Sequence, residues 1–555
     1  MKIYISGWRF PCFIFVLSLL LCSFLGFLND IPERDVAGRY AAMAEAFAVG
    51  DWTYAFHPRI PPLLPCCAGI FAWLTGCSGF VAAKSVSILF FALCVFPLYG
   101  IFRRTFGENI AQWGCVLLMF SSHFIRIAVG GLRDSGKGMA MMIACYAIVC
   151  VWQQRTKLAG YIWCACGAAL LTLTRGDCVL YALLFLSTIL FFELYRRRSL
   201  FFPWRTVIAL FLYLLCLSPQ LAYNYRTIGY PVPEVRYGMI LNKLEQQLGL
   251  NFYNRNAIVK LPGLQSDASP VAAPTAVAAL RSNHIATAGN PALDISDEPS
   301  AASKSGYAVA EFIDSLFKGF YPYFFFFAIP VIVMRIYRRE WKTEESILLA
   351  VLLGHAFLIV MQIIIFDKYL YVSRRYLIPV APLALGWSAI GMLALWEWLR
   401  AKVPVLLENR AAAPVVFAGC AIALLADSSG PTIKDYTSHQ KSTERNATLQ
   451  IAEFIRDDFG SRTMRINREL DCSSYRSNRR PLIFGDLKVL GYCAGGQDIE
   501  MEDTDVRNGR ISPDYIVDCN VNGQSETQYP GFSRIKSIQI NNVQYAVWKA
   551  GGKLL

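Results

Sequence analysis

Long apolar runs recur along most of the chain, and short polar stretches separate them. A helix needs about 20 apolar residues to cross the ~30 Å hydrocarbon core of a bilayer. By this measure the pattern predicts about eleven membrane-spanning helices. They lie near residues 8–28, 81–102, 110–130, 138–152, 158–174, 178–195, 204–223, 319–336, 346–366, 376–396 and 411–426.

Two of the apolar runs allow more than one interpretation. The run at 61–77 is short and rich in proline, so we expect it to lie half-inserted at the interface or to form a further span. The first run, 8–28, fits either a cleaved signal peptide or a retained signal anchor. Its nearly unbroken apolar character and the lack of a small-x-small cleavage site favour the anchor.

The basic residues of the short loops predict an orientation, because Lys and Arg collect on the cytoplasmic side of a membrane. Arg133, Lys137, Arg374 and Arg375 then face outward, against the rule, and need another reason. The net charge of +13 is mostly a topology signal and gives little support to nucleic-acid binding. With the N-terminus inside, every predicted inner loop has at least two bases: Arg103 and Arg104; Arg155 and Lys157; Arg196, Arg197 and Arg198; Arg335, Arg338 and Arg339; Arg400, Lys402 and Arg410.

Composition places the chain among polytopic α-helical membrane proteins. Hydrophobic residues make up 55% of the sequence and charged residues 17%, and the mean hydropathy is +0.38. A soluble chain of this length is less apolar. Most of the 17 cysteines lie in the predicted spans, where they act as small hydrophobic residues. Cys472, Cys493 and Cys519 lie outside the spans, and one pair of these could be oxidised.

The sequence divides into a membrane domain, 1–427, and a small extracytoplasmic α/β domain, 428–555. Within the membrane domain, 29–80 forms the first outer loop with interfacial helices. A second outer loop, 224–307, is rich in Ala, Ser and Pro at its centre, and we expect it to be partly disordered. In the tail, the pattern predicts a helix at 448–460 and strands at 463–470, 513–519, 532–540 and 543–550.

One stretch, "GGLRDSGKGMA", imitates a nucleotide-binding loop. Gly131 to Lys137 fits G-x-x-x-x-G-K, but Gly138 follows where Mg²⁺ binding needs Ser or Thr. No strand is expected before it, because it lies between two spans. The sequence therefore argues against an ATP site, and we expect a short outer loop with Arg133, Asp134 and Lys137 at the mouth of a cavity.

Paired charges stand at other predicted outer connections too. "TLTRGDCVLY" contains Arg175 and Asp177, and "FDKYLYVSRRYLIPVAPL" contains Arg374 and Arg375. Any one of them could be a snorkelling residue or a structural ion pair. Taken together they favour function, since a charge at membrane depth costs about 2.5–3.5 kcal/mol on insertion scales.

These residue types suit a reaction on a phosphate-linked lipid. Arginine binds phosphate through two parallel charge-assisted hydrogen bonds, and a nearby carboxylate can accept a proton from an attacking hydroxyl. The arrangement fits an amphiphilic donor reached from the bilayer and an acceptor reached from the aqueous side.

Five motifs carry a resemblance to a known family, in the order "RDVAGRYAAMAEAFAVGDW", "PRIPPLLP", "RDSGKG", "GAALLTLTRGD" and "SRRYLIPVAPLAL". With them the chain resembles the GT-C superfamily of polyprenyl-phosphate-sugar-dependent glycosyltransferases. Within this superfamily it resembles bacterial relatives of the dolichyl-phosphate-mannose protein mannosyltransferases and aminoarabinose lipid A transferases. The motifs extend over about residues 8–400, and several members carry a tail domain.

The resemblance implies a catalytic Asp at the start of the first outer loop, which maps to Asp35, with Glu33 and Asp30 close by. A helix that starts at Asp35 would place this carboxylate at a favourable helix terminus. The apolar face that follows would hold the helix at the membrane interface. Glu33 and Arg34 would orient the site or face the acceptor, with a helix-capping role as the alternative, and Tyr40, Asp134, Arg175 and Asp177 are further supporting candidates.

The resemblance also implies that Arg375, with Arg374 adjacent, holds the lipid phosphate. The chain departs from the family at Ile60, where aminoarabinose transferases have a Lys before a proline, and Arg59 or Lys137 could substitute. Arg133 completes the set of donor-binding candidates. No zinc-type cluster is present. Some relatives use a metal and others do not, so the need for a divalent cation stays open.

The function predicted is that of an inverting glycosyltransferase in a bacterial inner membrane, with its active site and tail domain on the periplasmic side. It would move a sugar from a polyprenyl-phosphate carrier to a protein, lipid A or polysaccharide acceptor. The main alternative is a transporter or flippase of lipid-linked saccharides. Such proteins tend to have internal repeats and broken helices, and the sequence pattern suggests neither. An envelope scaffold is a third alternative.

Overall fold

The architecture comes from a computed structural model, which describes the membrane region in several long segments and the tail in short ones. Every structural statement below concerns these described residues. They are 7–28, 33, 35–58, 60–153, 158–197, 203–234, 322–366, 375, 380–402, 426, 450–451, 453–454, 466–467, 515–521, 532–540 and 543–550.

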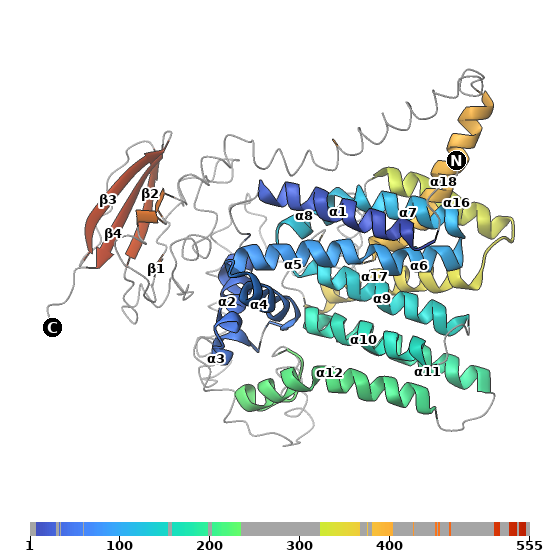
Figure 1. Cartoon of the computed structure of the whole chain (residues 1–555), viewed down its shortest axis with the longest axis horizontal. Helices are drawn as coiled ribbons and strands as arrows, with labels where there is room; N and C mark the ends of the chain where they lie inside the picture. Colours follow the sequence, from blue (N-terminus) through green and yellow to red (C-terminus); the bar gives the residue numbers. More distant parts are fainter. Residues whose placement is uncertain are drawn as a thin grey trace, which may run out of the picture.

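Long helices lie side by side in one bundle, and short helices cover one of its ends (Figure 1). The short ones are η1 (Val36–Tyr40), α2 (Ala41–Ala48), α3 (Trp52–Ala55) and α4 (Leu63–Thr75). The others are α1 (Arg9–Phe27), α5 (Gly79–Leu93), α6 (Val95–Thr105), α7 (Glu108–Met119), α8 (Ser122–Val129), α9 (Asp134–Trp152), α10 (Ala159–Thr174), η2 (Gly176–Cys178), α11 (Val179–Arg197), α12 (Trp204–Ile228), α16 (Pro322–Tyr337), α17 (Thr343–Phe366) and α18 (Ala381–Lys402).

Six helices in the described part of the chain are long and apolar enough to cross a membrane, and a bent pair makes up to seven. Each predicted span up to residue 396 overlaps a helix, but several are too short or too polar to count by this measure. The expected total of about eleven is therefore not confirmed. The span predicted at 411–426 lies outside the described residues, apart from residue 426. The run at 61–77 contains α4, a shorter apolar helix.

One predicted span, 110–130, is broken in two. The helices α7 and α8 meet at an angle of 54°. Ser121, between them, has an extended backbone conformation (φ −76°, ψ 91°), which a continuous helix cannot contain. The expectation that the chain has no broken helix is thus wrong at this position.

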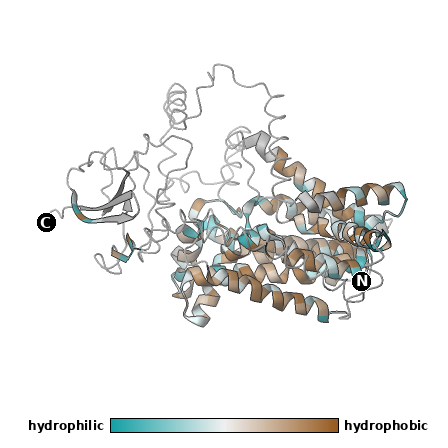
Figure 2. Ribbon diagram, turned by 90° about the horizontal axis from the view of Figure 1, so that it is seen from above, coloured by the Kyte–Doolittle hydropathy of each residue, from teal (hydrophilic) through white to brown (hydrophobic). Residues whose placement is uncertain are grey.

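Helix α1 shows how sequence spacing produces the bundle. Phe10, Ile14, Ser18 and Cys22 recur every four residues and are buried against neighbouring helices. Phe24, on another face, is 64% exposed. Apolar lengths dominate the helices, and polar residues gather towards their ends (Figure 2). An exposed apolar surface of this kind suits contact with lipid.

The helix α9 lies at the centre of the bundle. Within its most apolar stretch 83% of residues are buried, against 28% for α12 and 22% for α17. Small residues permit the close approach of its neighbours. A Cβ at Gly167 in α10 would collide with Ala144 of α9, and one at Gly100 in α6 would collide with the Tyr146 ring.

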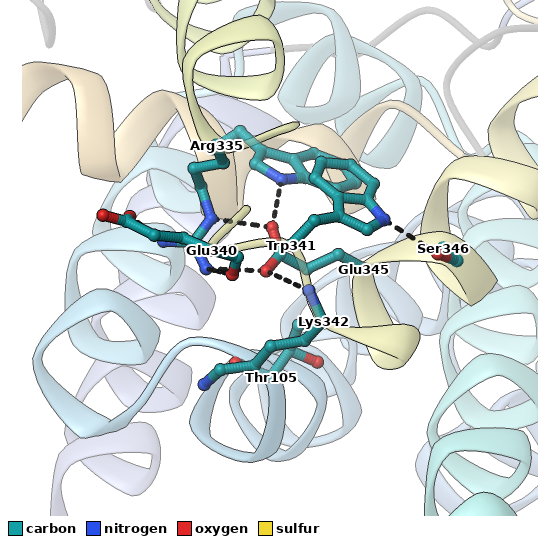
Figure 3. Close-up of polar contacts among 8 residues, drawn as sticks. Thr105, Arg335, Glu340, Trp341, Lys342, Glu345 and Ser346 are labelled. Carbon is teal, nitrogen blue, oxygen red and sulfur yellow. Dashed lines mark hydrogen bonds and ion pairs between the residues drawn. The ribbon is translucent and has the colours of Figure 1, made fainter. Parts of the chain in front are cut away.

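A buried polar cluster joins α16, α17 and α18 (Figure 3), at the end of the bundle away from α2 (Figure 1). The Glu345 carboxylate, 0% exposed, accepts hydrogen bonds from Arg335 Nε (3.0 Å) and Nη2 (2.7 Å). It also accepts one from the Trp387 indole N–H (3.0 Å), and the Trp341 ring stacks on Trp387 with centroids 5.9 Å apart. We call Arg335, Trp341, Lys342, Glu345 and Trp387 the Glu345 cluster.

The Glu345 cluster is tied to the rest of the bundle. Lys342 Nζ donates to the Thr105 carbonyl at the end of α6 (3.0 Å, Figure 3). Next to the cluster, Gln153 after α9 donates to the Glu344 carboxylate (2.8 Å). These contacts fix α17 to α6 and α9 by polar bonds where its apolar packing is slight.

The tail contains a four-stranded sheet of β1 (Ile466–Asn467), β2 (Tyr515–Val521), β3 (Phe532–Ile540) and β4 (Val543–Ala550). Its order is β1-β2-β4-β3, with β1 parallel to β2 and the other pairs antiparallel. All four strands were expected from the sequence. Of the helix predicted at 448–460, residues 450–451 and 453–454 are described and are helical. Cys472 and Cys493 lie outside the described residues, as does the loop from 235 to 307.

Candidate active site

Asp35 stands at the start of a helical segment, as the sequence predicts. It is the N-cap of η1, a short π-helix that continues into α2. The Glu33 carbonyl accepts the N–H groups of Val36 and Ala37, both at 2.9 Å, and so fixes the turn that carries Asp35. Val36 and Ala37 are buried, while the Asp35 side chain is 46% exposed. The backbone is thus anchored and the carboxylate stays accessible.

The Asp35 carboxylate forms an ion pair with Arg375. Arg375 Nη1 lies 3.1 Å from Asp35 Oδ2, although the two residues are 340 positions apart in sequence. Arg375 is 41% exposed. The fold therefore brings together the acid and the arginine that the motifs single out. The other Asp35 oxygen, Oδ1, is not used in this contact.

A second charged group lies at the first turn of α9. Arg175 Nη1 donates to Asp134 Oδ1 (3.2 Å), while its Nε and Nη2 donate to Asp177 (2.9 and 3.1 Å). Burial alone would lower the pKa of Arg175, but the carboxylates of Asp177 and Asp134 raise it above its ordinary value. One arginine thus neutralises both acids, each of which would be costly if unpaired.

Arg133 and Lys137 make no such ion pair within the described part of the chain. The Arg133 guanidinium lies 5.8 Å from the centre of the Tyr40 ring. The Lys137 ammonium lies 5.4 Å from the centre of the Tyr181 ring. Lys137 is only 2% exposed and Tyr40 only 4%. Burial raises the pKa of Tyr40, an effect that the charge of Arg133 opposes, so Tyr40 is a neutral phenol at pH 7.

The structure corrects the expected loop at Arg133 to Lys137. Asp134 to Lys137 form the buried first turn of α9, and a turn at Gly131 (φ 74°) joins it to α8. The positive end of a helix favours Asp134, and Arg175 compensates the charge that remains. A helix, α8, precedes Gly131, so the strand that a nucleotide-binding loop needs is absent at this point. Arg175 and Asp177 do occupy a turn, η2.

The remaining candidates are placed only in part. Glu33 is exposed and lies beside Gly130. Ile60 is buried, at 3% exposure, so no cation comes from that position. Asp30, Arg34, Arg59 and Arg374 lie outside the described residues.

Sequence reasoning missed Tyr181 and Glu234. Tyr181 lies inside an apolar run and looks like a core residue, although it follows Asp177 by one helical turn. Glu234 is 7% exposed, and a Cβ at Gly176 would collide with its carboxylate. Only the spacing of four residues after "RGD" could have pointed to Tyr181.

No group of three His, Cys, Asp or Glu residues that could hold a metal ion exists among the residues that the structure describes. The acids at this end are instead engaged by arginines, as Asp134 and Asp177 are by Arg175. Whether a divalent cation takes part stays a prediction.

Comparison with known proteins gives a family match over part of the chain. Residues 57–223 match the family described as dolichyl-phosphate-mannose-protein mannosyltransferase. This segment contains α4 to α11 and most of α12, and therefore Arg133, Lys137 and Arg175. No curated protein shows significant sequence similarity to the chain.

The chain is similar in fold to a solved structure of ArnT. ArnT from Cupriavidus metallidurans, bound to undecaprenyl phosphate, is 12% identical with a TM-score of 0.53, and the match covers 98% of each chain. The apo oligosaccharyltransferase of Archaeoglobus fulgidus is 13% identical with a TM-score of 0.49, and the match covers 92% of this chain and 69% of that one. The resemblance to the GT-C superfamily that the motifs predict is therefore confirmed, and the apolar helices make the chain an integral membrane protein.

Proposed function

We propose that the chain is an inverting glycosyltransferase that moves a sugar from a polyprenyl-phosphate carrier to an acceptor at the outer face of the membrane. The observation that carries this proposal is the 3.1 Å contact between Asp35 and Arg375. It joins a proton acceptor and a phosphate-binding group across 340 positions of sequence. Lys137 of α9 and Arg133, the residue before this helix, lie over the rings of Tyr181 and Tyr40 and provide further anion-binding groups.

The reaction needs one base and one cation. A hydroxyl or amine of the acceptor attacks the anomeric carbon, and its proton passes to Asp35. The bond between that carbon and the phosphate oxygen breaks, and its electron pair leaves with the phosphate. Arginine neutralises this charge, so no general acid is required. General-base help of this kind typically gives a factor of about 10²–10⁴ in rate.

The guanidinium of Arg375 can serve both groups. It has five N–H donors in a planar fork, and the contact with Asp35 uses Nη1. We infer that another edge of the same fork binds the phosphate, with the anomeric carbon between the leaving phosphate and the base, as inversion requires. Side-chain exposures of 41% and 46% leave both Arg375 and Asp35 open to a substrate.

Similar proteins support a lipid-phosphate donor. The family matched by residues 57–223 is named for dolichyl-phosphate-mannose, and the ArnT structure contains undecaprenyl phosphate. We infer that this chain uses a donor of the same chemical class. The acceptor would be a protein, lipid A or a polysaccharide. The orientation predicted from basic loops puts the site on the periplasmic side of a bacterial inner membrane.

Transport of a lipid-linked saccharide is the second candidate. The break between α7 and α8, bent by 54°, favours it, because transporters build substrate sites from broken helices. Beside the break, however, Phe124 packs against Phe91 with ring centroids 4.9 Å apart, an apolar contact. The paired charges lie instead at the helix ends.

The purified chain, reconstituted in lipid vesicles with a polyprenyl-phosphate sugar and candidate acceptors, separates these functions. A transferase releases polyprenyl phosphate in step with glycosylated acceptor, which mass spectrometry detects. A transporter moves the intact donor between leaflets and releases none. A scaffold does neither. Intact donor throughout, with every acceptor class tried, would exclude the proposed reaction.

A further inference from the structure

The acids and the bases at the start of α9 have different contact partners. Asp134 and the neighbouring Asp177 are both bound by Arg175, at 2.9 to 3.2 Å. Arg133, the N-cap of α9, and Lys137, four residues later, contact tyrosine rings instead of carboxylates. Arg175 therefore compensates the two acids, while neither base forms an ion pair with a carboxylate in the described part of the chain.

The burial of the Lys137 ammonium is compensated only in part. Lys137 is 2% exposed, and its ammonium has no hydrogen bond or ion pair within the described ranges. The face of an aromatic ring attracts a cation but replaces only part of its lost hydration. An anion that enters the site would complete the compensation. An ionisable side chain buried in a membrane protein, with only a ring contact and the more distant charge of Asp177 to compensate it, points to a functional site.

The two tyrosines link the bases to the proposed catalytic acid. Tyr40 is the last residue of η1, the helical turn whose N-cap is Asp35. The Arg133 guanidinium lies over the Tyr40 ring, and Tyr40 is 4% exposed. Tyr181, also 4% exposed, is backed by the His355 ring of α17, with centroids 5.3 Å apart. Both rings are thus fixed by packing and can hold a cation in one place.

We propose that Tyr181 and Tyr40 are positioning residues, which hold Lys137 and Arg133 away from the nearby carboxylates and keep them ready for the phosphate of the lipid donor. This inference rests on the proposed function and assigns separate roles to the residues of the site. Arg375 contacts the base Asp35 and contributes to phosphate binding, and the two aromatic-held cations complete the phosphate subsite. The rings themselves do not touch the reacting atoms.

The test measures equilibrium binding of a polyprenyl phosphate to the full chain in nanodiscs. Tyr181→Phe keeps the ring and should bind within about twofold of wild type, whereas Tyr181→Leu should bind about 2- to 30-fold more weakly. Lys137→Met should lose at least as much. In the Lys137→Met background, Tyr181→Leu should cause no further loss, because the ring acts through the lysine.

A matched control is Tyr99→Leu, the same change at a buried tyrosine that bonds Glu108 and the Gly7 carbonyl at the other end of the bundle. It should leave binding unchanged. Wild-type affinity in Tyr181→Leu would overturn the inference, and so would an equal loss in Tyr181→Phe or an additive loss in the double variant.

Two further measurements identify the source of the phosphate. They also separate failure of this inference from failure of the proposed function. Inorganic phosphate at equal concentration should compete poorly, and polyprenol without phosphate should not compete. Competition by inorganic phosphate as strong as that by the lipid would overturn the assignment to a lipid donor. No binding of polyprenyl phosphate by the wild type would overturn the proposed function itself. Binding that depends on Lys137 but not on Tyr181 would overturn this inference alone.

Discussion

Asp35, Glu33 and Asp30 are close in sequence, and residue chemistry alone cannot choose between them as the base. The structure distinguishes the two that it describes. Glu33 contributes its carbonyl to the turn, and its side chain is exposed. The Asp35 carboxylate instead accepts a hydrogen bond from Arg375, which is distant in sequence. That pairing depends on a contact over 340 positions, which no local pattern predicts.

Arg375→Lys tests the phosphate role of this arginine. A lysine keeps the charge but cannot form two parallel hydrogen bonds, so the KM for the donor should rise by about tenfold, as expected for one lost charged hydrogen bond. Steady-state kinetics with a polyprenyl-phosphate sugar measures this. Arg338→Lys, at an exposed arginine that follows α16, should keep the wild-type KM. An unchanged KM in both variants would make Arg375 a mere interfacial anchor.

At the scale of helices and strands, apolar periodicity predicted where elements lie but not how they end. The run at 138–152 was expected to start after Lys137, yet α9 starts at Asp134 because Arg175 compensates the buried acid. The break at Ser121 was missed, since the residues on both sides are apolar. The strands of the tail, with alternating patterns and clear turns, were predicted best.

The Glu345 cluster provides an element-scale prediction. Glu345→Gln removes the buried partner of Arg335, and loss of one member of a buried pair costs about 3–5 kcal/mol. The thermal unfolding midpoint of the protein in detergent should fall markedly. Glu340→Gln is the matched control, because Glu340 contacts the same arginine at 3.6 Å but is 52% exposed. Its midpoint should barely change. Equal midpoints for the two variants would contradict the structural role given to the cluster.

The helix contacts at Gly79 provide a second prediction at the scale of elements. A Cβ there would collide with the Ala41 carbonyl, and the Gly79 N–H donates to Glu45 (2.8 Å). Gly79→Ala should therefore destabilise the junction of α2 and α5 by about 1–3 kcal/mol, as overpacking does. Gly354→Ala in α17, where a Cβ would meet Leu184 only at an ordinary van der Waals distance of 4.0 Å, should be neutral or slightly stabilising. Limited proteolysis and thermal unfolding compare them, and a stable Gly79→Ala protein would rule out this packing.

At the scale of the whole molecule, the basic loops predict which side the site faces. A phosphatase reporter fused after Ala426 should be active outside the cytoplasm, and one fused at Arg197 should be inactive. Fusions in intact cells measure both. The reverse pattern would place Asp35 on the cytoplasmic side, away from the acceptors proposed for it.

The central claim is that Asp35 is the base of a single displacement at the anomeric carbon of the sugar. The most direct measurement is the rate at which purified wild type and Asp35→Asn release polyprenyl phosphate from a polyprenyl-phosphate sugar in the presence of acceptor. Asn keeps the size and polarity of the side chain but cannot take the proton. We predict a rate about 10²–10⁴-fold lower for Asp35→Asn, with polyprenyl phosphate still bound. Near-normal release by Asp35→Asn would contradict the account.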